Sequence, residues 1–599
     1  MNEQKKTKGA KWFGIPNLVP YMRPYGKLIF WMVLMAFYGS AMDAVIPLFQ
    51  QYAIDHYIAD STLAGLGWFI GAYVVVILTQ TASNYISAFG ACKLELSVGR
   101  DLKRESFNHL QTLSFSYFNQ NSVGYVHARV MSDTDRIAST LAWSMAEGVW
   151  HSAYLVCAIV MMLILNWKMA LCVLVIVPIV AISSMYFQKK LVFFHRQVRE
   201  KNSRITGATT TKTLVVEDKM EKEFDELTAD MKKVSVRAMH FRAIFISTTT
   251  LAASLALALV LWRGGIVTRE GVMLIGTLTV FMNYAQGMME PIQWLVQALS
   301  SLVNVQVNVE RFTTLMETKS DVQDTPEVVE KYGDTFSPKK ENWEELHGDI
   351  EFKDVTFRYP DGDENILEHF NLKVPQGTNV AIVGETGAGK STLVNLVCRF
   401  YEPTEGQVLI DGRDARERSQ LWLHSNIGYV LQTPHLFSGT VLENLRYGRE
   451  NATMGEIEAA VRAVSAEGII ERLPDGYQSD VGEGGNSLST GEKQLLSFAR
   501  ALLADPRIFV LDEATSSVDT VTERLIQDAI EKVMDGRTSF VIAHRLSTIR
   551  HADVILVVNA GRIVERGSHA ELMAKKGVYY GLYTRQYREE QIQASMENE

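Results

Sequence analysis

The chain reads Gly384-Glu385-Thr386-Gly387-Ala388-Gly389-Lys390-Ser391 between an apolar run at 379–383 and a helical pattern at 392–399. A strand, a glycine-rich loop and a helix in this order are typical of a phosphate-binding loop, whereas a chance glycine-rich turn lacks that context. The glycines let backbone N–H groups turn toward phosphate oxygens, and the helix start adds a favourable dipole. We therefore expect Lys390 to reach the β- and γ-phosphates of a nucleotide and Ser391 to hold Mg²⁺.

A second apolar run, Ile508-Phe509-Val510-Leu511, ends in the acids Asp512 and Glu513. A carboxylate at a strand end beside a phosphate-binding loop can hold Mg²⁺ through water, which is the role we expect for Asp512. Glu513 can polarise the attacking water. Adjacent acids can also be plain solvated surface, but the upstream phosphate-binding loop argues against that interpretation.

The N-terminal half contains six long apolar stretches. Each is close to the roughly 20 residues that a helix needs to cross a bilayer. They run over about 27–48, 66–86, 144–165, 170–187, 243–262 and 274–296. This half is therefore predicted to be an all-α membrane domain of six transmembrane helices.

Two charged stretches, 93–136 and 189–242, separate these apolar runs, and both are rich in Lys and Arg. The positive-inside rule places them in the cytoplasm as long helical extensions of the spans. The short links between the other spans then lie outside, and both chain termini lie inside. We expect a multi-pass protein of the cell membrane whose second half is cytoplasmic.

Several polar residues interrupt the apolar spans. A charge that faces lipid is costly, so these residues should face a bundle interior or a water-filled cavity, where they contact either substrate or other helices. They are Asp43, Gln80, Asn84, Glu147, His151, Gln286 and Glu290. Three prolines, Pro47, Pro178 and Pro291, are expected to kink their helices.

Composition excludes some classes. The 599 residues carry a net charge of −9 with no basic stripe, which argues against a nucleic-acid partner. The 4 cysteines are scattered, which favours buried reduced thiols over a disulfide framework. We expect a membrane domain at 1–316, an acidic linker at 317–347, a nucleotide-binding domain at 348–585 and a tail at 586–599.

A third motif, Leu488-Ser489-Thr490-Gly491-Glu492, precedes Asp512. It resembles the signature of ABC exporters, of the type in which a half-transporter fuses both domains, as in bacterial multidrug and lipid exporters. The resemblance implies an α/β P-loop ABC ATPase domain after the helical membrane domain. The family signature most often reads Leu-Ser-Gly-Gly-Gln, so Thr490 and Glu492 are departures, and Glu492 adds a negative charge near ATP that could weaken the site.

The resemblance also implies roles for single residues. Tyr359 resembles the aromatic residue that stacks on adenine, Gln432 the glutamine that touches Mg²⁺ and water, and His544 the histidine that contacts the γ-phosphate. Asp519 lies in the segment that resembles the D-loop, and 481–484 resembles an exporter-specific segment. The nucleotide-binding set is then Tyr359, Gly384, Glu385, Thr386, Gly387, Ala388, Gly389, Lys390, Ser391, Thr392, Ser489, Gly491, Glu492 and Asp519. The metal set is Ser391, Gln432 and Asp512, and the catalytic set is Glu513, His544 and Gln432.

Two segments of the membrane half resemble the intracellular loops of these exporters. The first is 113–118 with Gly124 and Arg129, and the second is 207–217. The resemblance implies that they carry short coupling helices that dock on the ATPase domains.

The resemblance further implies a dimer, a homodimer or a heterodimer, in which each ATP lies between one chain's P-loop and the other chain's signature. Closure of the two cassettes would switch the cavity from inward- to outward-facing. We expect an amphipathic drug-like cargo first and a lipid second. A peptide exporter or an ATP-gated channel could share this architecture, and an importer is disfavoured because its domains are usually on separate chains.

Overall fold

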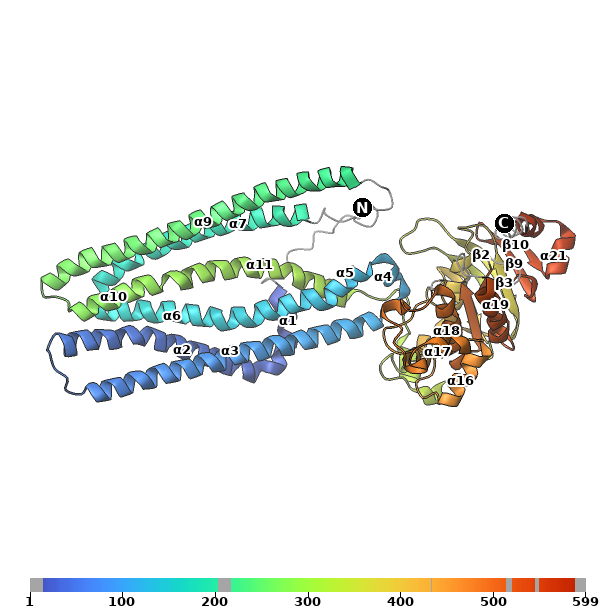
Figure 1. Cartoon of the computed structure of the whole chain (residues 1–599), viewed down its shortest axis with the longest axis horizontal. Helices are drawn as coiled ribbons and strands as arrows, with labels where there is room; N and C mark the ends of the chain where they lie inside the picture. Colours follow the sequence, from blue (N-terminus) through green and yellow to red (C-terminus); the bar gives the residue numbers. More distant parts are fainter. Residues whose placement is uncertain are drawn as a thin grey trace. The chain divides into compact units, whose positions relative to one another are not determined.

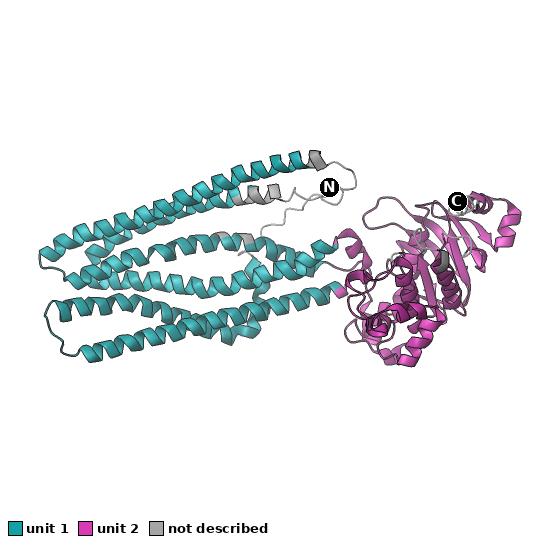
Figure 2. Ribbon diagram, in the orientation of Figure 1, with its two compact units in different colours: residues 1–110, 123–318 teal, residues 111–122, 319–599 magenta. Residues whose placement is uncertain are grey.

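The computed structural model describes residues 14–202, 217–432, 434–512, 520–543, 549–585 and 587. The chain forms two compact units (Figure 2). The first covers Met1–Leu110 and Val123–Thr318, and the second covers Gln111–Ser122 and Lys319–Glu599. The short segment that begins at Gln111 therefore packs with the C-terminal half, although the chain enters and leaves it from the first unit.

In its described residues, the first unit is helical. Its elements are α1 (Ile15–Met22), η2 (Arg23–Tyr25), α2 (Gly26–Tyr52), η3 (Ala53–Ile58), α3 (Leu66–Gln111), α5 (Val123–His127), η4 (Ala128–Asp133), α6 (Thr134–Leu174), α7 (Ile176–Asn202), α9 (Glu217–Arg269), α10 (Ile275–Gly287) and α11 (Met289–Glu317). Helices α3 and α9 are each continuous (Figure 1); α3 passes from an apolar part into a charged part, and α9 from a charged part into an apolar part. The charged stretches thus continue the apolar spans as helix.

Five helical segments in the described part of the chain are long and apolar enough to cross a membrane. They are Ile15–Ile58, Leu66–Gln111, Val123–Leu174, Val177–Phe194 and Phe224–Arg269. The sixth predicted span, 274–296, is shared between α10 and α11, which meet at Met288. Because α10 has only 13 residues, this region does not form one long apolar helix, and the count of six stays a prediction.

The third and fourth predicted spans are separated at Asn166, whose φ of −160° and ψ of 99° interrupt the helix. The Asn166 side-chain oxygen accepts a hydrogen bond from the backbone N–H of Met169 at 3.2 Å. An asparagine that accepts from an N–H three residues on caps the start of a helix. A new helix therefore begins after Asn166, as the short predicted link requires.

Two of the three predicted kink positions coincide with interruptions of a helix, at Val175 three residues before Pro178 and at Met288 three residues before Pro291. Pro178 and Pro291 lie in the first turns of α7 and α11, not in their interiors. A proline is tolerated there because the first N–H groups of a helix have no partner within it. These two prolines mark helix starts, whereas Pro47 lies inside α2 and is buried.

The second unit is an α/β domain with two sheets. One has the strand order β2-β1-β4-β5 and is antiparallel, and the other has the order β10-β9-β3-β8-β7-β6. In the second sheet the pairs from β9 to β6 are parallel, and β10 is antiparallel at the edge. The strands are β1 (Ile350–Phe357), β2 (Leu367–Val374), β3 (Asn379–Val383), β4 (Glu405–Ile410), β5 (Arg413–Asp414), β6 (Ile427–Val430), β7 (Ile508–Asp512), β8 (Thr538–Ile542), β9 (Val554–Asn559) and β10 (Arg562–Gly567).

The helices of this unit are short. They are α4 (Phe115–Gln120), α12 (Pro326–Tyr332), α13 (Lys390–Val397), α14 (Gln420–Ser425), α15 (Val441–Arg446), α16 (Met454–Ala463), α17 (Glu467–Arg472), α18 (Thr490–Leu503), α19 (Thr520–Met534) and α21 (His569–Lys575). Single 3₁₀ turns lie at η5 (Lys340–Asn342), η6 (Ala415–Glu417), η7 (Gly476–Gln478) and η8 (Glu483–Gly485). Of the predicted linker at 317–347, the part from Lys319 onward belongs to this unit, contains α12 and buries Val328, Tyr332 and Leu346.

The parallel strands are buried on both faces, which explains their continuous apolar runs. In β7, Ile508 and Val510 contribute to one core, and Phe509 and Leu511 to the other. Because side chains alternate along a strand, one run of four apolar residues supplies both cores. This packing fixes the register of β7 and therefore the position of Asp512 at its end.

Candidate functional site

The predicted phosphate-binding loop lies between β3 and α13. Gly387 and Gly389 have φ values of 84° and 100°, a left-handed conformation that favours glycine, and Gly389 caps α13. At Gly384 a Cβ atom would lie 2.2 Å from the carbonyl oxygen of Val558, so only glycine fits there. The predicted strand at 379–383 is confirmed, and the helix begins at Lys390.

Lys390 is buried inside this loop. Its Nζ donates hydrogen bonds to the carbonyl oxygens of Gly384 at 2.7 Å and Glu385 at 3.0 Å. Burial lowers the pKa of Lys390, and the charge of Asp512 opposes this shift. The ammonium group is thus held inside the loop by bonds to backbone oxygens, which phosphate oxygens could replace.

Asp512 ends β7, and β8 separates β7 from β3. The carboxyl ends of neighbouring parallel strands meet at one edge of a sheet, which is where ligands bind in open α/β sheets. In the sequence, the predicted catalytic residues Glu513 and His544 come directly after Asp512 and Ala543. Glu513, Asp519 and His544 lie outside the described residues.

The residues at this edge fit Mg²⁺ by their chemistry. A serine hydroxyl at 391 and a carboxylate at 512 are oxygen ligands, and Mg²⁺ usually takes one or two such protein ligands beside phosphates and water. Within the described ranges no group of three His, Cys, Asp or Glu side chains could hold a metal by itself. Gln432, the third predicted ligand, is exposed just after β6, the strand next to β7.

Tyr359 contacts both α13, the helix after the phosphate-binding loop, and strand β1 of the antiparallel sheet. Its hydroxyl lies 3.0 Å from the hydroxyl of Thr392, and its ring packs edge-on against Phe357 at 4.9 Å and Tyr401 at 5.0 Å. The ring is half-buried. Tyr359 therefore contacts the helix that follows the phosphate-binding loop.

The signature motif forms the start of α18. Ser489 is the N-cap, its side chain accepts from the N–H of Glu492 at 3.3 Å, and the Glu492 carboxylate accepts from the N–H of Ser489 at 2.8 Å. Ser489 is exposed and Gly491 is buried. Among the described residues, no hydrogen bond or ion pair joins this motif to 384–392 of the same chain.

Segment 481–484, which resembles an exporter-specific segment, is hydrogen-bonded to the helix that begins at the signature. The backbone N–H of Val481 donates to Gly439 at 3.0 Å, and Ser487 Oγ donates to the carbonyl of Val481 at 2.8 Å. Lys493 Nζ donates to the carbonyl of Gly484 at 3.1 Å. Segment 481–484 is thus bonded both to the chain that follows Gln432 and to the signature helix.

Helix α4 lies in the first segment that resembles an intracellular loop, and it packs against the rest of the second unit. The ring of Phe115 stacks on Phe400, and Asn119 Nδ2 donates to the hydroxyl of Tyr401 at 3.0 Å. Burial raises the pKa of Tyr401, and the bond from Asn119 opposes this shift. Tyr401 also contacts Tyr359, the residue predicted to stack on adenine. Tyr401 therefore connects α4 to Tyr359.

Sequence reasoning missed Phe400 and Tyr401. They follow α13 and Arg399, a buried arginine with a φ of 51° that pairs with Asp324 and Glu402, both at 2.9 Å. The sequence feature that could have indicated them is an arginine followed by two aromatic residues just after α13. The second loop-like segment, 207–217, lies outside the described residues except for Glu217.

Polar residues of the first unit form two clusters. In the first, Gln80 donates to Asp43. In the second, Trp294 Nε1 donates to Glu147 at 2.6 Å, and its ring stacks on buried His151 with centroids 4.7 Å apart. Both clusters link different helices, so part of the predicted polar set serves helix packing.

The remaining polar residues of the predicted spans lie outside these two clusters. Asn84, Gln286 and Glu290 are exposed, and Asn84 lies against Gly39, where a Cβ atom would be 2.5 Å from its side-chain oxygen. Glu290 lies one helical turn before Trp294 on α11.

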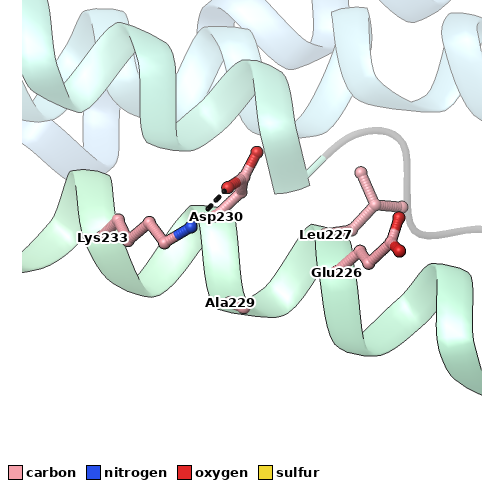
Figure 3. Close-up of a pocket in the computed structure, with 5 residues that line it drawn as sticks. All are labelled: Glu226, Leu227, Ala229, Asp230 and Lys233. Carbon is pink, nitrogen blue, oxygen red and sulfur yellow. Dashed lines mark hydrogen bonds and ion pairs between the residues drawn. The ribbon is translucent and has the colours of Figure 1, made fainter.

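A surface hollow on α9 stands apart from these sites. It is lined by Glu226, Leu227, Ala229, Asp230 and Lys233. Lys233 and Asp230 pair at 3.4 Å (Figure 3). The hollow shares no residue with the predicted nucleotide or substrate sets.

Comparisons with known proteins agree with this arrangement. Residues 29–292 match the family model of the ABC transporter transmembrane region, and residues 367–516 match the ABC transporter model. The Bacillus subtilis ABC transporter ATP-binding protein YfiC is 33% identical over 594 residues, covering 97% of this chain and 95% of the relative. The chain belongs to the ABC exporter family.

Other relatives of this ABC exporter carry more specific names. The ATP-dependent lipid A-core flippase of Desulfotalea psychrophila is 33% identical, covering 95% of this chain and 98% of the flippase. The probable multidrug resistance ABC transporter YheH of Bacillus subtilis is 36% identical, covering 86% of this chain and 75% of YheH. The solved structure of a bacterial Atm1-family ABC exporter with ATP bound has a TM-score of 0.77 at 26% identity, covering 94% of this chain and 98% of that one. This exporter is therefore an ATP-hydrolysing membrane transporter.

Proposed function

We propose that the chain is one half of a dimeric exporter that moves an amphipathic, drug-like organic cation out of the cytoplasm. The observation that carries the substrate class is the charge of the spans. Asp43, Glu147 and Glu290 are their only acidic residues, and Lys27, at the very start of the first span, is their only Lys or Arg. An ionised group in a membrane-spanning bundle needs a partner, and a cationic cargo can supply one.

The surroundings of Glu147 support a cation further. Its carboxylate has Trp294 as a hydrogen-bond partner, and Glu290 lies one turn from that tryptophan. Indole rings attract cations through their faces, and an acid beside a ring adds charge attraction. An aromatic cation would meet both kinds of contact between α6 and α11.

ATP binding would use the loop at 384–391. Lys390 would exchange its bonds to backbone carbonyls for bonds to phosphate oxygens, with Ser391, Asp512 and Gln432 around Mg²⁺. Glu513 would orient the attacking water, His544 would contact the γ-phosphate, and Tyr359 the adenine. The exposed position of Ser489, without a bond to its own loop, supports a site completed by the signature of a second copy.

The membrane orientation completes the proposal. The Lys- and Arg-rich stretches favour a cytoplasmic cassette and cytoplasmic termini. Helix α4 would carry the motion of the cassette to the helical unit, because it is bonded to the cassette while the chain on either side of it belongs to the other unit.

A matched pair of probes tests the substrate class. Tetraphenylphosphonium and tetraphenylborate have nearly the same shape and opposite charge. In proteoliposomes we expect ATP-driven uphill movement of the cation and stimulation of the ATPase by it, with neither for the anion. Glu147→Gln and Glu290→Gln should reduce both, whereas Glu270→Gln, an exposed acid between α9 and α10, should not.

The same assay separates the alternatives. Downhill-only movement would indicate a channel. Stimulation by tetraphenylborate as strong as by the phosphonium would overturn the cation. A lipid is the second candidate because relatives are named lipid A-core flippases, and ATP-driven flipping of a labelled lipid without phosphonium transport would favour it.

A further inference from the structure

Glu492 is the residue by which this signature departs in charge from the common family pattern. It closes a capping box at the start of α18, with reciprocal bonds to Ser489. A glutamine at this position can close the same box, because either side chain can accept from the N-cap N–H. The difference between Glu and Gln here is therefore one negative charge, fixed within one turn of the exposed Ser489.

Arg472 meets that charge. It is the last residue of α17, and its guanidinium donates to Glu492 Oε1, whereas Glu492 Oε2 accepts from the backbone N–H of Ser489. The Arg472 side chain is 68% exposed and that of Glu492 is 22% exposed, so the pair lies at the surface of the cassette. Lys493, the neighbouring base, is bonded instead to the carbonyl of Gly484. Arg472 is therefore the base that pairs directly with the Glu492 carboxylate.

We infer that Arg472 is a positioning residue for the nucleotide contact of this signature, because it cancels the charge of Glu492 where the phosphates of a second copy's ATP would approach. This inference rests on the proposed shared site. A helix start attracts phosphate through its free N–H groups and its dipole, and an uncompensated carboxylate in the first turn would oppose that attraction. Arg472 leaves the attraction intact while Glu492 keeps the cap.

The inference predicts an order of KM values for MgATP. Relative to the wild type, Arg472→Ala removes one positive charge and should raise KM. Glu492→Gln keeps the cap, removes one negative charge and should lower KM. The double variant has the same net charge as the wild type, so its KM should return close to the wild-type value. We expect shifts of about threefold in each direction at low salt, which shrink as ionic strength rises.

Arg462→Ala is the matched control. Arg462 pairs with Glu467 at 3.0 Å in the same helical region, and its side chain is 70% exposed. Losing this surface pair should leave KM unchanged, because it lies outside the signature.

The experiment measures KM, kcat and thermal unfolding of all four variants, beside Ser489→Arg. A purely structural role of Arg472 predicts a lower unfolding temperature and a double variant as impaired as Arg472→Ala. That result, or an unchanged KM in Arg472→Ala, overturns the inference. If Ser489→Arg keeps full turnover, the shared site itself fails, which is a separate outcome. A restored KM in the double variant also shows that Arg472→Ala fails through charge and not through misfolding.

Discussion

The ring of Phe115 lies against the ring of Phe400, with centroids 4.0 Å apart and 28° between the planes. An aromatic pair of this kind contributes about 0.5–1.5 kcal/mol beyond the area that it buries. It is the apolar part of the contact that holds α4 on the cassette.

Replacing either ring should uncouple ATP use from transport. We expect Phe115→Ala and Phe400→Ala to keep basal ATPase activity but to lose most cargo stimulation and transport, because α4 is no longer held. The double variant should be little worse than the poorer single variant, since both remove the same contact. Phe336→Ala removes an exposed ring of the same unit and serves as the control. Full cargo stimulation in both single variants would refute the coupling role of α4.

Glu513→Gln should separate binding from turnover. The amide keeps the shape of the side chain and loses the base, so we expect kcat to fall by about 10²–10⁴-fold while ATP is retained. Steady-state ATPase measured beside nucleotide retention provides the check. Near-normal turnover would remove Glu513 from its proposed role.

Mixed dimers should show where each ATP lies. In a dimer of a Lys390→Ala chain and a Ser489→Arg chain, both defects fall on one composite site, and the other site has an intact loop and an intact signature. We expect ATPase activity to return in tandem-tagged mixed dimers, whereas both parent homodimers are inactive. Sites built within single chains would give no return, with nucleotide occupancy showing both sites empty.

Thiol reactivity should distinguish two cysteines. Cys398 is buried, and burial raises its pKa far above the usual 9.0. Its thiol therefore stays protonated at a pH at which an exposed thiol begins to ionise, and the thiolate is the reactive form. We expect maleimide at pH 8 to label exposed Cys92 in the folded protein and Cys398 only after unfolding. Equal labelling rates, read by mass spectrometry of the peptides, would contradict the burial of Cys398.

The parts that sequence predicted are those governed by local chemistry. Strand β3, the loop at 384–391 and the start of α13 follow from glycines, an apolar run and a helix pattern within a few residues of one another. The position of Asp512 follows from β7 in the same way. Such signals need no knowledge of the rest of the chain.

The parts that sequence did not predict depend on distant contacts. Asn119 and Tyr401 are 282 residues apart, and no local pattern in either segment names the other. The partner of Glu492 was missed for a similar reason, because Arg472 reads as an ordinary helix-ending base. The break at Met288 also escaped notice, because the apolar run continues across it.

The placement of α4 in the second unit has a consequence for how such exporters can be recombined. A cut at residue 319 looks like a clean seam along the chain, yet it removes a helix that the cassette uses to cover Phe400 and Tyr401. A chimera that joins this cassette to another exporter's membrane half inherits a foreign α4. Compatible grafts should therefore be chosen by matching residues 111–122 to the receiving cassette, not by similarity of the spans.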